Sequence, residues 1–337
     1  MKKIIQKNEL SSEAKASIRT RVISAIVMIA LTVPCLIFGG WFWFAFVFAG
    51  LVGAAYELTK ITPLKGKFRI VIYIIVILLT IAITYYQFFT KLNDAIQSGN
   101  VSPENLFVNL GTIDLSEMII MLVAAVFFII CFMKEAFSID LVFYFVSMII
   151  VIGLGFQSFL YLRYLPFSTS SIGFGNCLDL TQPIFKYWQS ALLILFVLIG
   201  VLMNDTGAYF VGILFGKHKM NPRISPKKTW EGFIGGIAVS MICSLLWAIL
   251  WSIGGFPILP ILDHTHWYWV LIASILLPIM GDIGDFVFSA IKRHFGVKDF
   301  SQLIPGHGGI LDRIDSVIFA SAFVAALIVF MVFIGAV

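Results

Sequence analysis

The stretch DIGDFVFSAIKRHFGVKDFSQLIPGHGGILDRIDS, from Asp282 to Ser316, places acids, bases and a Gly-rich loop between two apolar runs. Only 12% of the chain is charged, so this density of charge needs an explanation. At about 100° per residue, a helix through its first half would gather the polar side chains within an arc of roughly 100°. The sequence therefore predicts two carboxylates, a hydroxyl and two cations on one helix face: Asp282, Asp285, Ser289, Lys292 and Arg293.

The composition predicts an integral membrane protein. The 337 residues are 60% hydrophobic and include 33 Phe, and the mean hydropathy is +0.99. A bilayer requires runs of about 20 apolar residues, whereas no soluble core requires this much apolar surface. Lys292 and Arg293 alone would fit cations that snorkel from a helix end. Asp282 and Asp285 lie deeper, where an unpaired carboxylate costs on the order of 3 kcal/mol, so they are interpreted as functional.

The apolar runs predict an all-α polytopic membrane protein with about nine transmembrane helices. Basic residues set its orientation, because Lys and Arg concentrate on the cytoplasmic side. With the N-terminus in the cytoplasm, only Lys91, Arg163 and Lys186 fall outside the cytoplasmic segments. The C-terminus is then outside, and the stretch from Asp282 to Ser316 faces the cytoplasm. The predicted spans are 21–38, 41–56, 69–90, 117–133, 139–160, 188–215, 232–254, 267–291 and 314–336.

Three regions are expected: a cytoplasmic arm at 1–20, about five membrane helices within 21–187, and a catalytic membrane region of about four spans within 188–337. The polar stretches 91–116 and 161–187 are expected to be outer loops without a chemical signal. Glu57, at the cytoplasmic end of the second span, is the one polar residue of the first five spans that could reach a central site, although solvation at the membrane surface is the favoured role. A nucleic-acid partner is not expected, because the basic residues are scattered over loops without a recognised binding motif.

The loop Pro305-Gly306-His307-Gly308-Gly309 runs into the last apolar stretch, which starts with Asp312-Arg313-Ile314-Asp315. A Gly-rich loop that leads into a helix N-terminus is typical of phosphate binding. Capping and compensation of the helix dipole would explain one of the two acids. Together with Asp285, Asp312 and Asp315 have the oxygen ligands that a hard divalent cation prefers.

A second polar block begins with Asn204-Asp205-Thr206 inside an apolar run and continues to Ser225-Pro226-Lys227-Lys228-Thr229. The cost of burying Asp205 predicts that it faces the bundle interior, in a role at the site or in a hydrogen bond between helices. Ser225 before Pro226 predicts a helix start, with both lysines in the first turn. The alternative for either lysine alone is a purely topological role.

These two blocks carry a resemblance to a known family. The residues Ser289, Lys292-Arg293, Lys298-Asp299, Pro305–Gly309 and Asp312–Asp315, at these spacings, resemble the signature of the phosphatidate cytidylyltransferases, or CDP-diacylglycerol synthases. The block from Asn204 to Gly232 is similar to the other recurring stretch of that family. The motifs cover residues 204–316, and the first half of the chain matches by hydropathy only.

The resemblance implies a nucleotidyltransferase that transfers the cytidylyl group of CTP to phosphatidate, giving CDP-diacylglycerol and pyrophosphate in phospholipid biosynthesis. It implies a multi-pass protein of the cell membrane that takes phosphatidate from the cytoplasmic leaflet. Mg²⁺ is the implied cofactor, held by Asp285 and Asp312 with Asp282 or Asp315 nearby, and a second cation is left open. Lys228 and Lys292 join Asp285 and Asp312 as implied catalytic residues. The implied phosphate-binding residues are Ser225, Lys227, Thr229, Ser289, Arg293, His307, Gly308, Gly309 and Arg313.

Three alternatives stay open. The acceptor could be another lipid, such as a polyprenyl or ether lipid, because residues near a headgroup do not report on lipid tails. An ion-coupled transporter would also place acids inside a bundle, although it would favour repeated halves and broken helices. An assembly factor without activity would not require this constellation of acids and bases. A homodimer is compatible with an enzyme of this size, but the sequence assigns no contact face.

Overall fold

The computed structural model describes residues 12–98, 115–168, 191–256, 258, 262, 264 and 266–334. This part of the chain contains nine helices and one two-stranded antiparallel sheet. The elements are α1 (Ser12–Phe38), α2 (Gly40–Lys60), α3 (Gly66–Ser98), α5 (Leu115–Met133), α6 (Ile139–Ser168), α7 (Ala191–Phe215), β1 (Lys219–Asn221), β2 (Ser225–Thr229), α8 (Trp230–Ile253), α9 (Trp267–His294) and α10 (Leu311–Phe333).

The helices match the predicted apolar runs. Eight of those described are long and apolar enough to cross a membrane, and in α5 the apolar part, Met118–Met133, is shorter. Large apolar side chains such as Ile29 and Phe132 lie exposed on the outer surface, as expected where hydrocarbon is the solvent. The prediction of an all-α polytopic membrane protein is therefore confirmed.

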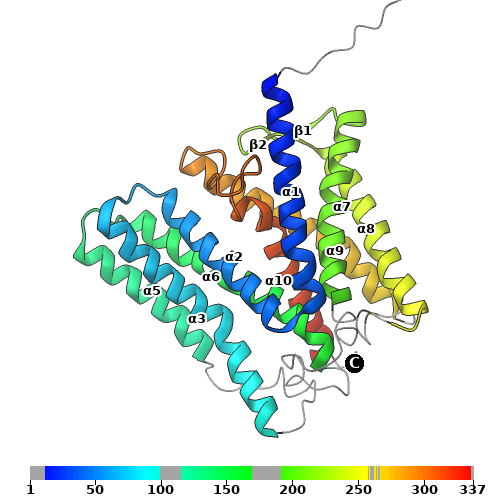
Figure 1. Ribbon diagram of the computed structural model, residues 1–337, viewed down its shortest axis with the longest axis horizontal. Coiled ribbons are helices and arrows are strands. Elements are labelled where there is room, and N and C mark those ends of the chain that lie inside the picture. Colours follow the sequence, from blue (N-terminus) through cyan, green and yellow to red (C-terminus); the bar gives the residue numbers. More distant parts are fainter. Residues whose placement is uncertain are drawn as a thin grey trace, which may run out of the picture.

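The arrangement of the helices gathers the polar connections at one end of the bundle. Successive helices alternate in direction, so that the start of α1 and the end of α10 lie at opposite ends (Figure 1). Helix α10 packs against α6, α7 and α9. The β1–β2 hairpin and the segment 295–310 lie at the end where α1 starts (Figure 1). The two polar blocks of the sequence therefore meet at the same end.

Some helices extend beyond the predicted spans. Helix α1 begins at Ser12, inside the predicted arm of residues 1–20, and residues 1–11 lie outside the described part. Helices α3 and α6 continue to Ser98 and Ser168, so the predicted outer loops 91–116 and 161–187 begin as helix. The remainder of both loops lies outside the described residues, except for Leu115 and Ser116, which begin α5. Hydropathy marks the part of a helix that crosses the membrane, whereas backbone hydrogen bonding continues into polar residues.

The predicted helix start at Ser225 is wrong. Residues Ser225–Thr229 form strand β2, which pairs with β1, and α8 begins only at Trp230. Pairing with β1 keeps this segment extended, because Asn221 lies opposite Ser225 and Lys219 lies opposite Thr229. Thr229 instead provides the N-cap, because its hydroxyl accepts the amide of Gly232 at 3.2 Å. Neighbouring residues of a strand point to opposite faces, so the two lysines of β2 are separated.

A glycine of α9 allows close approach of α10. A Cβ added at Gly284 would lie 2.6 Å from the backbone oxygen of Asp315 and 2.9 Å from the ring of Phe319. At Gly281, one turn earlier, the nearest atoms would be 3.7 Å away, which is an ordinary contact. The absence of a side chain at Gly284 therefore brings the first turns of α10 against the polar face of α9.

Candidate active site

Lys228 of β2 lies between the two carboxylates of α9. Its Nζ is 2.5 Å from Oδ1 of Asp282 and 2.7 Å from Oδ2 of Asp285. The side chain of Asp282 is only 6% exposed. Lys228 and Asp282 are 54 positions apart, so the structure joins the two polar blocks in one cluster.

The charge of Lys228 is maintained by this cluster. Burial lowers the pKa of Lys228, but the negative charges of Asp282 and Asp285 raise it more, and their hydrogen bonds to Nζ add to the effect. The pKa of Lys228 therefore lies above the ordinary lysine value. At neutral pH the side chain of Lys228 is therefore a cation.

Asn204 of α7 completes the surroundings of Asp282. Its Nδ2 donates a hydrogen bond to Oδ2 of Asp282 at 2.9 Å. Lys228 and Asn204 thus occupy one oxygen each, which compensates for the burial of this carboxylate. Gly236 of α8 leaves the space for this contact, because a Cβ there would lie 2.6 Å from Oδ1 of Asn204. The polar Asn204-Asp205 pair inside an apolar run is the sequence signal for this position.

Two more carboxylates share the electrostatic environment of the cluster. Asp205 of α7 interacts with the charges of Asp282 and Asp285. Asp315 of α10 interacts with the charges of Asp285 and Asp205. Asp205 is nevertheless exposed in the described structure, so its predicted orientation toward the bundle interior stays a prediction. Electrostatic interactions therefore link four carboxylates from three helices, and two of these carboxylates, Asp282 and Asp285, contact Lys228.

The donor chemistry of these carboxylates suits a hard divalent cation such as Mg²⁺, which prefers oxygen ligands. Among the described residues, however, no group of three or more His, Cys, Asp or Glu side chains is placed to hold a metal ion as it stands. The space between Asp282 and Asp285 contains Nζ of Lys228. A metal ion bound there would require Lys228 to leave at least one carboxylate.

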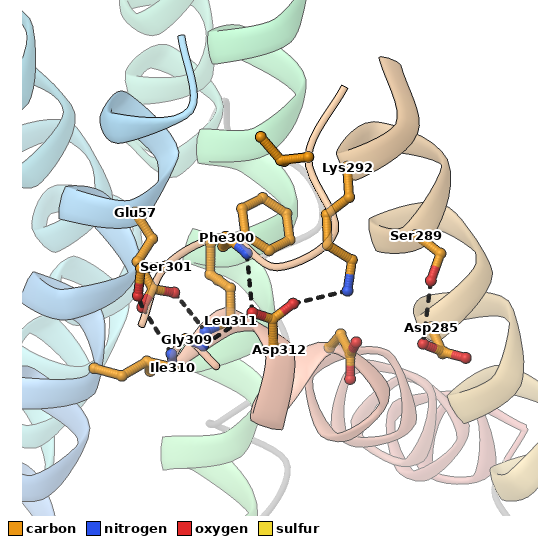
Figure 2. A network of polar contacts seen from close by, with 12 residues as sticks. Glu57, Asp285, Ser289, Lys292, Phe300, Ser301, Gly309, Ile310, Leu311 and Asp312 are labelled. Atoms are coloured by element: carbon orange, nitrogen blue, oxygen red, sulfur yellow. Dashed lines mark hydrogen bonds and ion pairs between the residues drawn. The ribbon is translucent and has the colours of Figure 1, made fainter. Parts of the chain in front are cut away.

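A second ion pair joins α9 to the start of α10. Nζ of Lys292 lies 2.7 Å from Oδ1 of Asp312, whose side chain is 4% exposed (Figure 2). Oδ2 of Asp312 accepts the amides of Phe300 and Gly309, each at 2.9 Å. Both oxygens of Asp312 are therefore occupied, and this carboxylate holds the segment between α9 and α10. Its predicted role as a metal ligand stays a prediction.

The predicted polar face of α9 is present. The hydroxyl of Ser289 donates to Oδ1 of Asp285 at 3.4 Å, one helical turn away (Figure 2). Lys292 follows on the same face and reaches Asp312. The guanidinium of Arg293, in contrast, is exposed and donates to the backbone oxygen of Val297 at 3.0 Å. Arg293 therefore fixes the chain after the helix.

Glu57 of α2 is the residue that the sequence interpretation misplaced. Its carboxylate is fully buried and is not solvated at a surface. Oε1 accepts the hydroxyl of Ser301 at 2.6 Å and the amide of Ile310 at 2.8 Å (Figure 2). Oε2 accepts the amide of Leu311 at 2.8 Å. The partners lie at least 244 positions away, so no local pattern could identify them.

The Gly-rich loop is closed on itself. The amides of His307 and Gly308 donate to the backbone oxygen of Ile304 at 2.9 and 3.1 Å, and the amide of Gly309 donates to Asp312. Gly308 has φ +88°, a left-handed conformation that favours glycine. A triphosphate would reach these three amides only after the loop opened, so the phosphate-binding role of Gly308 and Gly309 stays a prediction. Nδ1 of His307 is buried without a hydrogen-bond partner in the described structure.

The other predicted phosphate-binding residues divide between structural and exposed positions. Thr229 is buried as the N-cap of α8, and Ser225 begins strand β2. Lys227 and Arg313 are exposed. Of the predicted cations, Lys228 and Lys292 are therefore the two that the structure pairs with buried carboxylates.

Comparisons with known proteins show the family of this chain. The model of the family described as the Cytidylyltransferase family matches residues 19–331. The chain is 48% identical over 127 residues to a phosphatidate cytidylyltransferase of Staphylococcus saprophyticus, 50% over 127 residues to one of Staphylococcus haemolyticus and 46% over 127 residues to one of Staphylococcus aureus. Each alignment covers 37% of this chain and 45% of the relative. Since the family match includes both polar blocks and nearly all the helices, the chain belongs to the Cytidylyltransferase family.

Proposed function

We propose that this chain transfers the cytidylyl group of CTP to phosphatidate, forming CDP-diacylglycerol and pyrophosphate in phospholipid biosynthesis. Membership of the Cytidylyltransferase family supports the group that is transferred. The names of the relatives support phosphatidate as the acceptor. The matched part spans less than half of those relatives, so the residues of the site carry the remaining argument.

The reaction joins two anions. An oxygen of the lipid phosphate attacks the α-phosphorus of CTP and forms a new P–O bond. The bond from the α-phosphorus to the bridging oxygen breaks, and pyrophosphate leaves with the electron pair. The protein must hold both reactants in line and stabilise the charge that moves to the leaving group. No covalent enzyme intermediate is needed, because the lipid phosphate is itself a nucleophile.

Lys228 and Lys292 supply the positive charge in this proposal. Each ammonium group is partly or fully buried and is held by carboxylates from a different element. A phosphate oxygen that approaches either lysine replaces a carboxylate partner, so the cation is already in place before the substrate binds. Before the substrate binds, Asp282 and Asp285 hold Lys228 at the site.

Mg²⁺ is the proposed cofactor, and Asp285 and Asp312 would hold it, with Asp282 or Asp315 nearby. Asp312 would first have to release Lys292 or a loop amide. When bound, Mg²⁺ would neutralise phosphate oxygens and stabilise the leaving pyrophosphate. The remaining residues keep the carboxylates in position: Asn204 donates to Asp282. The observation that carries the proposal is the contact of Lys228 with both α9 carboxylates, because it unites the two polar blocks in a chain with few charges.

We further propose that the site faces the cytoplasm in the cell membrane and takes phosphatidate from the cytoplasmic leaflet. The distribution of Lys and Arg supports this side. The β1–β2 hairpin and the segment 295–310 lie at the end where α1 begins (Figure 1). A lipid phosphate in that leaflet would meet these connections without crossing the bilayer.

The test is pyrophosphate release by the purified protein in detergent micelles. Release is expected with CTP, Mg²⁺ and phosphatidate together, and omission of any one should abolish it. Release only with a polyprenyl phosphate or an ether lipid would show that the proposed acceptor is wrong. No release with any lipid would contradict the enzymatic proposal and favour an ion-coupled transporter.

A further inference from the structure

We propose that Glu57 is a positioning residue for the reaction, which holds the first turn of α10 and thereby Asp312. This inference rests on the proposed function for its kinetic consequence. Glu57 lies on α2, in the half of the chain where the family motifs are absent. Glu57 is 0% exposed, and within the described part of the chain the hydrogen bonds of its carboxylate all come from the segment that leads into α10.

Glu57 replaces a local helix cap. The first amides of a helix lack partners within that helix, and a side-chain oxygen just before the helix usually accepts one of them. The residue before α10 is Ile310, which has no side-chain acceptor. Glu57 instead accepts the amides of Ile310 and Leu311 from a different helix. Its negative charge also suits the positive end of the helix dipole.

The capping contact continues directly to Asp312. Leu311, whose amide binds Glu57, precedes Asp312 in the chain, and Asp312 binds Lys292. Figure 2 shows Gly309 and Leu311 between Glu57 and Asp312. A shift of the first turn of α10 would therefore move Asp312 relative to Lys292.

The fit around the carboxylate is tight. A Cβ added at Gly309 would lie 2.6 Å from each oxygen of Glu57. The Ser301 hydroxyl is also buried and donates to Oε1. The loop therefore has little conformational freedom. A small change at Glu57 should displace Asp312.

A merely structural anchor and a positioning residue differ in their response to Glu57→Gln. Glutamine keeps the shape, but its NH₂ group is a donor and cannot accept the amide of Ile310 or Leu311. The first turn of α10 should loosen without loss of core volume. An anchor of α2 would lower the amount of folded protein only, whereas a positioning residue would lower the turnover of the protein that is folded.

Three variants of the full-length chain in detergent test the proposal: Glu57→Gln, Ser301→Ala and Thr59→Val. Thr59 is the matched control, since it is buried on the same helix and its hydroxyl binds only backbone oxygens of α2 among the described residues. Hydrogen exchange of the peptide that contains residues 309–312 measures how well the amides at the start of α10 are protected. The kcat and KM for CTP, per folded protein, measure the reaction.

In Glu57→Gln we expect exchange at residues 310–312 to accelerate about tenfold and kcat to fall about tenfold or more, as for loss of a hydrogen bond to a charged group. The KM for CTP should change less than about twofold, and Thr59→Val should resemble the wild type. If the kcat of Glu57→Gln equalled that of Thr59→Val, the proposal would be overturned.

Ser301→Ala decides the question if Glu57→Gln does not fold. It leaves the carboxylate and removes one of its three hydrogen bonds, together with the hydrogen bond from the amide of Leu303 to the Ser301 hydroxyl. A kcat per folded protein below that of Thr59→Val supports positioning, and an equal kcat overturns it. Hydrogen exchange needs no turnover. Inactivity of the wild type with every lipid would therefore count against the proposed function, and the exchange data would still decide whether Glu57 caps α10.

Discussion

Nζ of Lys228 lies 2.7 Å from Oδ2 of Asp285 and thereby ties strand β2 to helix α9. The preceding residue, Lys227, is exposed. Because strand residues alternate between two faces, the hairpin directs only one of the two consecutive lysines to the carboxylates. In a helical first turn, neither residue would be selected in this way.

Replacement of the two lysines should therefore have unequal effects. Lys228→Met removes the cation between Asp282 and Asp285, and we expect the rate of pyrophosphate release to fall about 100-fold or more. Lys227→Met should lower the rate less than about fivefold, since its side chain is exposed. Both rates are measured at saturating CTP and phosphatidate, and equal losses would contradict the assignment of Lys228 to the site.

The raised pKa of Lys228 predicts how stability depends on pH. A lysine whose folded-state pKa is raised stabilises the protein fully below its unfolded pKa, and this contribution is lost as the pH rises through the folded pKa. The difference in thermal midpoint between the wild type and Lys228→Met should thus stay constant from about pH 6 to 9 and decline only above about pH 10.4. Thermal unfolding in detergent at several pH values measures it. A difference that rises as the pH approaches about 10.4, or that shows no decline above it, would mean that the pKa is not raised.

Two glycines of α9 offer a matched pair for the contact with α10. A Cβ at Gly284 would lie 2.6 Å from the backbone oxygen of Asp315, so Gly284→Ala should push the helices apart and lower activity about tenfold or more. Gly281→Ala should stay within about twofold of the wild type, because its nearest neighbours would be 3.7 Å away. Activity per folded protein is the measurement, and comparable losses in both variants would show that α10 does not need this approach.

Asn204→Ala tests the support of Asp282. The change leaves one oxygen of a nearly buried carboxylate without its donor, which costs about 1–3 kcal/mol. We expect a fall of about tenfold in kcat and a higher Mg²⁺ concentration for half-maximal activity. Ser244→Ala is the control, because Ser244 is buried in the neighbouring helix α8 and binds backbone oxygens of that helix. A Mg²⁺ dependence unchanged from Ser244→Ala would contradict the positioning of Asp282 by Asn204.

Local patterns predicted much of this architecture. The apolar runs match the helices because membrane insertion depends on hydropathy over a single segment. The shared face of Asp285, Ser289 and Lys292 followed from the helical repeat, and the hydrogen bond from Ser289 to Asp285 confirms it. The predicted helix start at Ser225 was wrong because the proline suggested a helix. The segment Ser225–Thr229 forms a strand instead, and strand pairing depends on a partner segment.

Contacts between segments that are distant in the chain could not be predicted from local sequence patterns. Glu57 looks like a solvated acid at the end of an apolar run, and its role appears only when α10 is placed beside α2. The same holds for the Gly-rich loop, whose amides are already bonded to Ile304 and Asp312. Spacing indicates which groups are available for chemistry, whereas tertiary packing decides which of their hydrogen bonds are already made.

The most direct test of the central claim follows the cytidylyl group itself. The purified chain is incubated in micelles with phosphatidate, Mg²⁺ and CTP labelled at the α-phosphate, and the label in the extracted lipid is measured. We predict labelled CDP-diacylglycerol in a one-to-one ratio with pyrophosphate, and no labelled lipid with Asp285→Asn. Pyrophosphate or phosphate released without labelled lipid, or labelled lipid formed equally well by Asp285→Asn, would contradict the proposed reaction and its site.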